Sequence, residues 1–444
     1  MPTITGLKAY DLRFPTSLEA HGSDAMHTDP DYSCGYVVIT TDAGDGLEGH
    51  GLTFTCGRGT EVVVVAIQSL SFLLVGKKLE DIYDDFSSFW RALTSESQMR
   101  WIGPEKGVIH LATAAIVNAL WDLWAKREGK PLWKLLVDMD PEKLVSCIDF
   151  RYISDVLTKE EAVEMLKKKQ EGKADREKEM LEKGYPAYIT SAGWLGYSED
   201  EIRKRCREGL AQGWTRFKVK VGADLADDVR RCGLIREEIG WDNTMMVDAN
   251  QRWDVQESID HMKRLAEFKP LWIEEPTSPD DALGHATIAK ALNPLGIGVA
   301  TGEQCQNRVI FKQMLQAGGL QFCQIDSCRM GGVNEVVSVI LMAAKFGIPV
   351  CPHAGGVGLC QMVQHLAVFD YVSVSASLDN RVCEFADHLH ENFKEAIVIK
   401  NASYVLPKAA GYSTEMKPES ISGYQYPNGA VWQQLFKEGK FTAP

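Results

Sequence analysis

The 444-residue sequence predicts an α/β fold in which a closed parallel barrel follows a mixed α+β region. Short apolar runs alternate with helical patterns over about 250 residues, which is the usual size of an eightfold βα barrel. Polar residues end most of these runs, at separations close to one βα unit. An open doubly wound sheet is the alternative, but its G-x-G-x-x-G signature after the first strand is absent.

The first part of the chain predicts strands and helices in one α+β unit. Residues 36–54 contain two strand-like runs around a Gly-rich turn, the pattern of a hairpin. Residues 106–131 are rich in Ala and Leu at helical spacing, and Gly129 and Pro131 end this helix.

The second part of the chain supplies the predicted barrel. Its strands are expected at 144–150, 215–221, 244–250, 271–276, 298–304, 321–327, 348–354 and 372–376. The highly charged residues 158–184 begin with a Thr158-x-x-Glu161 capping pattern and predict a solvated helical excursion between barrel units one and two. The tail 407–429 is rich in Pro, Gly and Ser and is expected to wrap over the surface.

Composition narrows the class of protein. The formal net charge is −13 and no basic patch stands out, which argues against a nucleic-acid partner. No apolar signal core opens the chain, and the apolar stretch 62–75 is too short to span a bilayer. Eleven cysteines without a C-x-x-C pair indicate reduced thiols in an intracellular compartment.

Three carboxylates end consecutive predicted strands: Asp248, Glu274 and Glu303. In a barrel they would converge at the C-terminal mouth and repel one another unless a cation neutralised them. Oxygen ligands suit a hard divalent ion, Mg²⁺ first and Mn²⁺ second. The alternative is that each carboxylate caps a helix or pairs with an arginine.

His353 ends a later strand, and Asp326 ends the strand before it. A carboxylate bonded to one ring nitrogen fixes the tautomer and raises the basicity of the other nitrogen. This pair predicts an acid–base group at the barrel mouth. A core histidine with satisfied hydrogen bonds is the alternative.

Lys218 and Lys220 lie two apart in the strand-like "TRFKVKVG" and therefore face the same side. Partial burial and a neighbouring like charge both favour the neutral amine, so we expect a lowered pKa and a lysine able to act as a general base. Snorkelling from an exposed strand is the alternative. Together with the metal and the His–Asp pair, the lysines suit removal of a proton α to a carboxylate.

The ordered set of motifs resembles the enolase superfamily, in its mandelate-racemase-like branch. The set includes "FKVKVG", "DANQRWD" at 248–254, "WIEEPTSPDD" at 272–281 and "CPHAGGVGLC" at 351–360. A Lys or His base with Mg²⁺ is the known pattern of such sites. Within this branch, "FPTSLEAHGSDAMHTDPDYS" at 14–33 is most similar to the L-fuconate dehydratase group and its vertebrate relatives.

The resemblance implies a capping domain at 1–140, a (β/α)₇β modified TIM barrel at 141–405 and a C-terminal segment, 406–444, that returns to the capping domain. It implies one Mg²⁺ per subunit on Asp248, Glu274 and Glu303. Lys220 would abstract the C2 proton, Lys218 would assist at the substrate carboxylate, and His353, oriented by Asp326, would help the C3 hydroxyl leave. The implied substrate-binding residues are Gly22, Ser23, Asp24, Tyr32, Lys218, Asn250, His353, Ala354, Gly355 and Glu384.

The expected activity is that of a hydro-lyase converting L-fuconate to 2-keto-3-deoxy-L-fuconate. The alternatives are a dehydratase or epimerase for another acid sugar and, in a different class, a non-catalytic binding or regulatory protein on the same scaffold. We further expect a homo-oligomer with a small-molecule sugar acid as substrate, without nucleic-acid or membrane partners, in the mitochondrial matrix or the cytosol.

Overall fold

A three-stranded antiparallel sheet begins the chain, with strands β1 (Ile4–Arg13), β2 (Ser33–Thr41) and β3 (Glu48–Thr55) in that spatial order. The computed structural model describes residues 1–444. Strands β2 and β3 form the predicted hairpin. Helices cover the sheet and lead toward the barrel: α1 (Thr60–Leu70), α2 (Leu79–Asp84), α3 (Phe86–Thr94), α4 (Gly107–Arg127), α5 (Leu132–Asp138) and α6 (Pro141–Ser146).

Helix α4 packs directly on β3. A Cβ atom on Gly51 would lie 2.3 Å from the carbonyl oxygen of Ala115, and one on Gly49 would lie 2.4 Å from that of Ala119, so glycine permits this close approach. By length and composition alone α4 could cross a membrane, but 89% of its apolar window is buried inside the protein. Helix α4 is therefore a core helix of the N-terminal unit.

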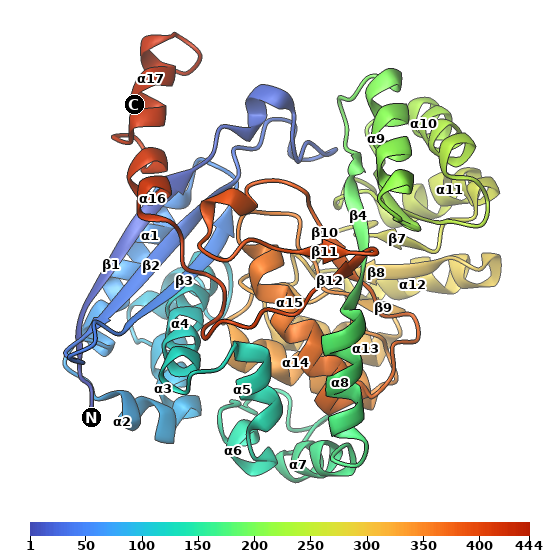
Figure 1. Ribbon diagram of the computed structural model, residues 1–444. Coiled ribbons are helices and arrows are strands. Elements are labelled where there is room, and N and C mark those ends of the chain that lie inside the picture. The colour runs from blue at the N-terminus through green and yellow to red at the C-terminus, as the bar shows by residue number, and fades with distance from the viewer.

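Parallel strands close into the barrel beside this unit (Figure 1). They are β4 (Tyr185–Gly193), β5 (Arg216–Lys220), β6 (Thr244–Asp248), β7 (Trp272–Glu274), β8 (Gly298–Thr301), β9 (Phe322–Cys323) and β10 (Cys383–Phe385). Between β9 and β10 one further segment forms part of the barrel wall, where Val350 makes a parallel bridge with Cys323. Strand β10 pairs in parallel with β4 and completes the circle.

One helix follows each strand except the last, as the predicted (β/α)₇β barrel requires. These helices are α9 (Glu199–Ala211), α10 (Leu225–Ile239), α11 (Val255–Leu265), α12 (Ala282–Leu292), α13 (Arg308–Ala317), α14 (Val333–Lys345) and α15 (Leu359–Phe369). The modified barrel and the α+β region before it are thus confirmed.

Two predicted strands are wrong. Residues 144–146 are the last residues of α6, which the Asp140 side chain caps and Pro141 begins, and residues 147–150 follow it outside any strand. Residues 372–376 continue α15 as a π-helical turn, Asp370–Ser375. The first barrel strand is instead β4, which the sequence reading missed.

The charged excursion is helical, as predicted, and forms α7 (Lys159–Lys168) and α8 (Lys173–Lys183). The side chains of Thr158 and Glu161 make the expected capping box. The position of the excursion differs from the prediction, because it precedes the first barrel strand instead of following it.

The C-terminal residues lie against the N-terminal sheet (Figure 1). After the short strands β11 (Ile399–Lys400) and β12 (Ser403–Tyr404), the chain forms α16 (Pro418–Tyr424) and α17 (Ala430–Lys437). The Tyr426 amide donates to the Asp11 carbonyl at 2.8 Å, and the Trp432 indole donates to the Arg13 carbonyl at 2.9 Å. These bonds fix the tail on strand β1.

The barrel interior holds its own apolar cluster, separate from the large core that joins the rest of the molecule. Its members are Tyr188, Met246, Trp272, Ala300, Phe322, Cys351 and Val382, all buried. They come from the strands around the barrel, so the barrel is filled by side chains. We call this cluster the barrel plug. The polar residues at the strand ends lie beyond it, at the barrel mouth.

Candidate active site

Strand register places the first charged groups on one level of the barrel. Lys220 of β5 pairs in register with Asp248 of β6, and Asp248 pairs with Glu274 of β7. Neighbouring residues in register on parallel strands point to the same face of the sheet. The prediction of one functional group per βα unit on a common ring therefore agrees with the pairing of these strands.

Asp248, Glu274 and Glu303 form a carboxylate triad, with one oxygen of each within 4.8 Å of the others. Burial raises the pKa of Glu274 to about 8, and the nearby Asp248 charge adds to this effect. Oxygen Oε2 of Glu303 is buried and receives no hydrogen bond. Three converging carboxylates suit a hard divalent cation, so the triad is consistent with the expected Mg²⁺.

The two lysines of β5 have different surroundings. Lys218 is 1% exposed, and its Nζ lies 2.7 Å from Glu274 Oε1 and 2.8 Å from Glu384 Oε1. The Nζ atom of Lys220 lies 2.5 Å from Asp248 Oδ2 and 3.1 Å from Asn250 Oδ1. Lys220 faces a cavity, whereas Lys218 lies deeper among carboxylates.

The expected lowering of the Lys220 pKa is not found. Burial lowers the pKa of Lys220, and the Lys218 charge adds to this effect as expected. The carboxylates of Asp248, Glu303 and Asp24 together more than offset both, so the pKa of Lys220 lies above its ordinary value. The largest share comes from Asp248, which was predicted as a metal ligand and lies in contact with Lys220.

His353 and Asp326 form the predicted pair, with 2.8 Å between Nδ1 and Oδ2. The other oxygen of Asp326 accepts the backbone N–H groups of Cys328 and Arg329, which fixes the carboxylate. The ring nitrogen Nε2 of His353 lies 3.3 Å from Glu303 Oε2. Burial lowers the pKa of His353, but Glu303 and Asp326 offset this and raise it to about 9.

Glu384 and Asn250 complete the mouth. The Ala354 and Gly355 amides donate to Glu384 Oε2 at 2.8 and 3.1 Å, which orients this carboxylate toward Lys218. Asn250 follows β6 with φ of 47°, in the left-handed region that Asn tolerates better than most residues. This turn directs its amide oxygen to Lys220.

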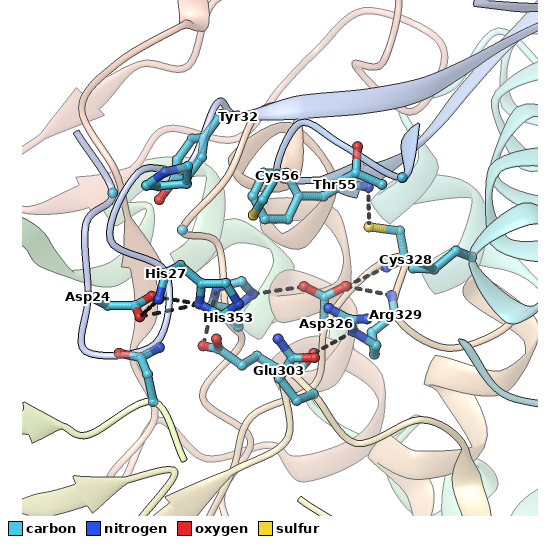
Figure 2. A pocket seen from close by; sticks show the side chains of 18 of the residues that line it. Asp24, His27, Tyr32, Thr55, Cys56, Glu303, Asp326, Cys328, Arg329 and His353 are labelled. Carbon is cyan, nitrogen blue, oxygen red and sulfur yellow. Dashed lines mark hydrogen bonds and ion pairs between the residues drawn. The ribbon is translucent and has the colours of Figure 1, made fainter. Parts of the chain in front are cut away.

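A cavity of about 380 Å³ lies above these groups, between the barrel mouth and the N-terminal unit (Figure 2). The predicted site residues that line it are Gly22, Asp24, Tyr32, Lys220, Asn250, Glu303, Asp326, His353, Gly355 and Glu384. Outside the lining are Ser23, Lys218, Asp248, Glu274 and Ala354. The Ser23 hydroxyl donates to the Thr28 carbonyl, so its side chain is used within its own loop.

Other lining residues were not predicted. They include His27, Cys56, Arg58, Thr190, Trp194, Gln304, Cys328 and Arg329. Most lie on loops or on the missed strand β4, where no periodic pattern distinguishes them. Arg329 directly follows the Asp326 motif, and that proximity is the one signal by which it could have been found.

Comparison with known proteins agrees with this geometry. Residues 201–420 match the family described as enolase C-terminal domain-like. Residues 23–137 match the mandelate racemase / muconate lactonizing enzyme N-terminal domain. The chain belongs to the enolase superfamily.

Three relatives illustrate the range of similarity within the superfamily. Human mitochondrial enolase superfamily member 1 is 68% identical over 97% of this chain and 98% of its own. Its crystal structure matches with a TM-score of 0.97 over 98% of both chains. L-galactonate dehydratase of Hypocrea jecorina is 56% identical over 97% of this chain and 96% of its own. A racemase from Streptomyces coelicolor with bound magnesium is 25% identical, with a TM-score of 0.72 over 95% of this chain and 99% of that one.

Proposed function

We propose that this protein is a Mg²⁺-dependent acid-sugar dehydratase, a hydro-lyase that acts on L-fuconate. The observation that carries the proposal is the shared cavity. Lys220, the His353–Asp326 pair and Glu303 of the triad all line it. A base, an acid and a metal-ligand set around one space are the groups that β-elimination of water from a hydroxy acid requires.

The proposed reaction transfers two protons. Lys220, in its neutral form, removes the proton from C2, next to the substrate carboxylate. His353 donates its proton from Nε2 to the hydroxyl on C3 as the C3–O bond breaks, and water leaves. The electron pair of the C2–H bond forms the C2=C3 double bond, and the enol tautomerises to the 2-keto-3-deoxy acid.

The chain's other residues position these two groups. Lys218 holds positive charge beside the substrate carboxylate, Asp326 fixes the His353 tautomer, and Asn250 and Glu384 contact the substrate. Mg²⁺ on Asp248, Glu274 and Glu303 would supply concentrated positive charge that stabilises the enediolate. It would also neutralise part of the carboxylate charge that raises the pKa of Lys220. A magnesium-bound relative at 25% identity supports this choice of ion.

L-galactonate is the second candidate substrate, because the L-galactonate dehydratase is 56% identical over nearly the whole chain. L-fuconate is 6-deoxy-L-galactonate, so the two acids share C1 to C5 and differ only at C6. L-fuconate and L-galactonate therefore present the same configuration at C2 and C3 to the site.

Incubation with Mg²⁺ and an acid-sugar panel tests the proposal. Formation of a 2-keto-3-deoxy product from L-fuconate, lost on chelation and restored by Mg²⁺, is the expected result. Absence of any ketone from L-fuconate would end the substrate claim, and product from L-galactonate alone would favour the second candidate. Deuterium entering C2 from solvent without ketone formation would identify an epimerase.

We also propose an intracellular location, in the mitochondrial matrix or the cytosol. All eleven cysteines are free, and ten are buried, as expected for a reducing compartment. The word mitochondrial in the name of the human relative favours the matrix. The homo-oligomer is a prediction that rests on the family resemblance alone.

A further inference from the structure

A second histidine–aspartate pair borders the cavity, on the loop between β1 and β2 (Figure 2). The Nδ1 atom of His27 lies 3.1 Å from Asp24 Oδ2. Oxygen Oδ1 of the same carboxylate accepts the backbone N–H groups of Met26 and His27, each at 2.7 Å. The Asp24 carboxylate is therefore engaged within the loop and holds the His27 ring in place.

The loop that carries this pair is fixed at several points. The Asp24 amide donates to the His27 carbonyl at 2.9 Å, which closes a tight turn. The Leu195 amide, just after β4, donates to the Ser23 carbonyl at 3.1 Å and ties the loop to the barrel. A side chain on a loop held in this way is preorganised for recognition.

His27 stands between two cavities. It lines the reaction cavity together with Lys220, and it also lines an outer cavity of about 660 Å³. Residues of the C-terminal segment, Trp432 and Phe436 among them, wall the outer cavity. His27 and Lys220 line the same cavity, so one acyclic acid with C2 at Lys220 can reach His27 with its far carbons.

The Nε2 atom of His27 is available to hydrogen-bond with the far carbons' hydroxyl groups on a bound acid. Nδ1 is bonded to Asp24, while Nε2 makes no hydrogen bond within the protein, and the side chain is 41% exposed. The Asp24 hydrogen bond raises the pKa of His27, which favours an N–H donor at Nε2. A hydrogen bond from such a charged group contributes more to binding than one between neutral groups.

We infer that His27 is a specificity residue that hydrogen-bonds through Nε2 to the substrate hydroxyls beyond C4, and that Asp24 is its positioning residue. The inference rests on the proposed function and deepens it. It adds a role for Asp24, whose expected contact with the substrate stays a prediction. The ligand class is an acyclic polyhydroxy acid of five or six carbons.

Selectivity between long and short acids tests the inference. The substrates are L-galactonate or L-fuconate and a four-carbon acid with the same C2 and C3 configuration, which lacks the hydroxyls beyond C4. We expect His27→Ala to lower kcat/KM for the six-carbon acid by about 10- to 100-fold and to change that for the four-carbon acid by less than about threefold. Asp24→Asn should shift the same ratio in the same direction.

Calorimetry gives a readout that needs no turnover. In a Lys220→Ala background, the added His27→Ala change should weaken binding of the six-carbon acid by about 10-fold or more. His21→Ala is the matched control, because His21 lies nearby outside the cavity lining, with Nδ1 at 3.0 Å from the Tyr197 hydroxyl. It should leave the ratio between the two acids unchanged.

The outcomes separate this inference from the proposed function. Equal losses on both acids, or unchanged affinity in the calorimetric comparison, would overturn the role of His27. If the wild-type protein binds the six-carbon acid but converts neither acid, the proposed function fails, and the calorimetric comparison still decides the role of His27. If it binds neither acid, both fall.

Discussion

The barrel mouth and the loop between β1 and β2 border the same cavity but are built in different ways. At the mouth, Lys220, Asp248 and Glu274 are held by paired parallel strands and are almost fully buried. On the loop, His27 is held by one carboxylate and a few backbone bonds and is half exposed. Strand pairing fixes groups that must not move relative to one another, while a loop can change without disturbing them.

This difference agrees with the separate roles proposed for the two regions. Groups that exchange protons need a fixed geometry, since a displacement of about 1 Å can cost about 100-fold in rate. Groups that select among similar acids need only one or two adjustable contacts. The mouth therefore suits the chemistry, and the loop suits the choice of substrate.

The largest expected effect comes from the mouth. Lys220→Ala removes the proposed base and should lower kcat by about 10³- to 10⁴-fold, within the range of general-base catalysis. The triad remains complete, so calorimetry should still detect Mg²⁺ binding. The keto-acid assay measures the loss, and the exposed Lys290→Ala on α12 is the control. A fully active Lys220→Ala variant would refute the assignment of Lys220 as the base. It would also refute the proposal that the barrel mouth carries out the proton transfer.

A second prediction concerns the junction of the N-terminal unit and the barrel. Buried Glu335 of α14 pairs with His110 of α4 at 2.6 Å and with Arg308 of α13 at 3.1 Å. Glu335→Gln should lower the free energy of unfolding by about 3 kcal/mol, because buried Arg308 loses one of its two carboxylate partners and the buried contact with His110 loses its charge. Urea denaturation measures this change, and the selectivity between acids should stay constant. A shifted selectivity would show that the junction contributes to substrate choice.

The same variant has a defined pH dependence. Burial raises the pKa of Glu335, but His110 and Arg308 lower it to about 2, against an ordinary value of 4.5. A folded-state pKa below the unfolded value stabilises the protein above about pH 4.5, and this contribution disappears as the pH falls toward 2. The difference between wild type and Glu335→Gln should therefore shrink below pH 4.5.

The smallest expected effect again tests the mouth. Asp326→Asn keeps the shape beside His353 but removes the charge that orients the ring. We expect kcat to fall by about 10- to 100-fold, with KM little changed, as is usual for a residue that acts through another. Steady-state kinetics measure this split, and the surface substitution Asp260→Asn is the control. A rise in KM alone would mean that Asp326 contributes to binding instead of proton transfer.

Much of the mouth could be predicted because the residues recur at the period of the fold. Asp248, Glu274 and Lys220 end strands that lie side by side, so their spacing in sequence becomes proximity in space. Their electrostatics were harder to predict. The contact between Lys220 and Asp248, together with the charges of Glu303 and Asp24, reverses the expected pKa shift, and a sequence period does not contain these distances.

The elements that were missed lack such a period. Strand β4 contains Pro186 and Gly193 and reads poorly as a buried strand, whereas the apolar run at 144–150 has strand-like composition but follows a strong helix cap. His27 pairs with a residue three positions away on a loop, and neither spacing nor composition marks that contact. Local hydrogen bonds, visible only in the structure, decide these cases.

The barrel plug limits the routes by which small molecules can reach and leave the cavity. Seven buried side chains, from Tyr188 to Val382, fill the barrel beneath the carboxylates. The cavity is therefore closed on the side of the barrel interior. Exchange with solvent therefore takes place on the side of the N-terminal unit, whose loop residues line the cavity opposite the barrel. A change in the loop between β1 and β2 would therefore alter the entrance to the cavity without altering the barrel plug.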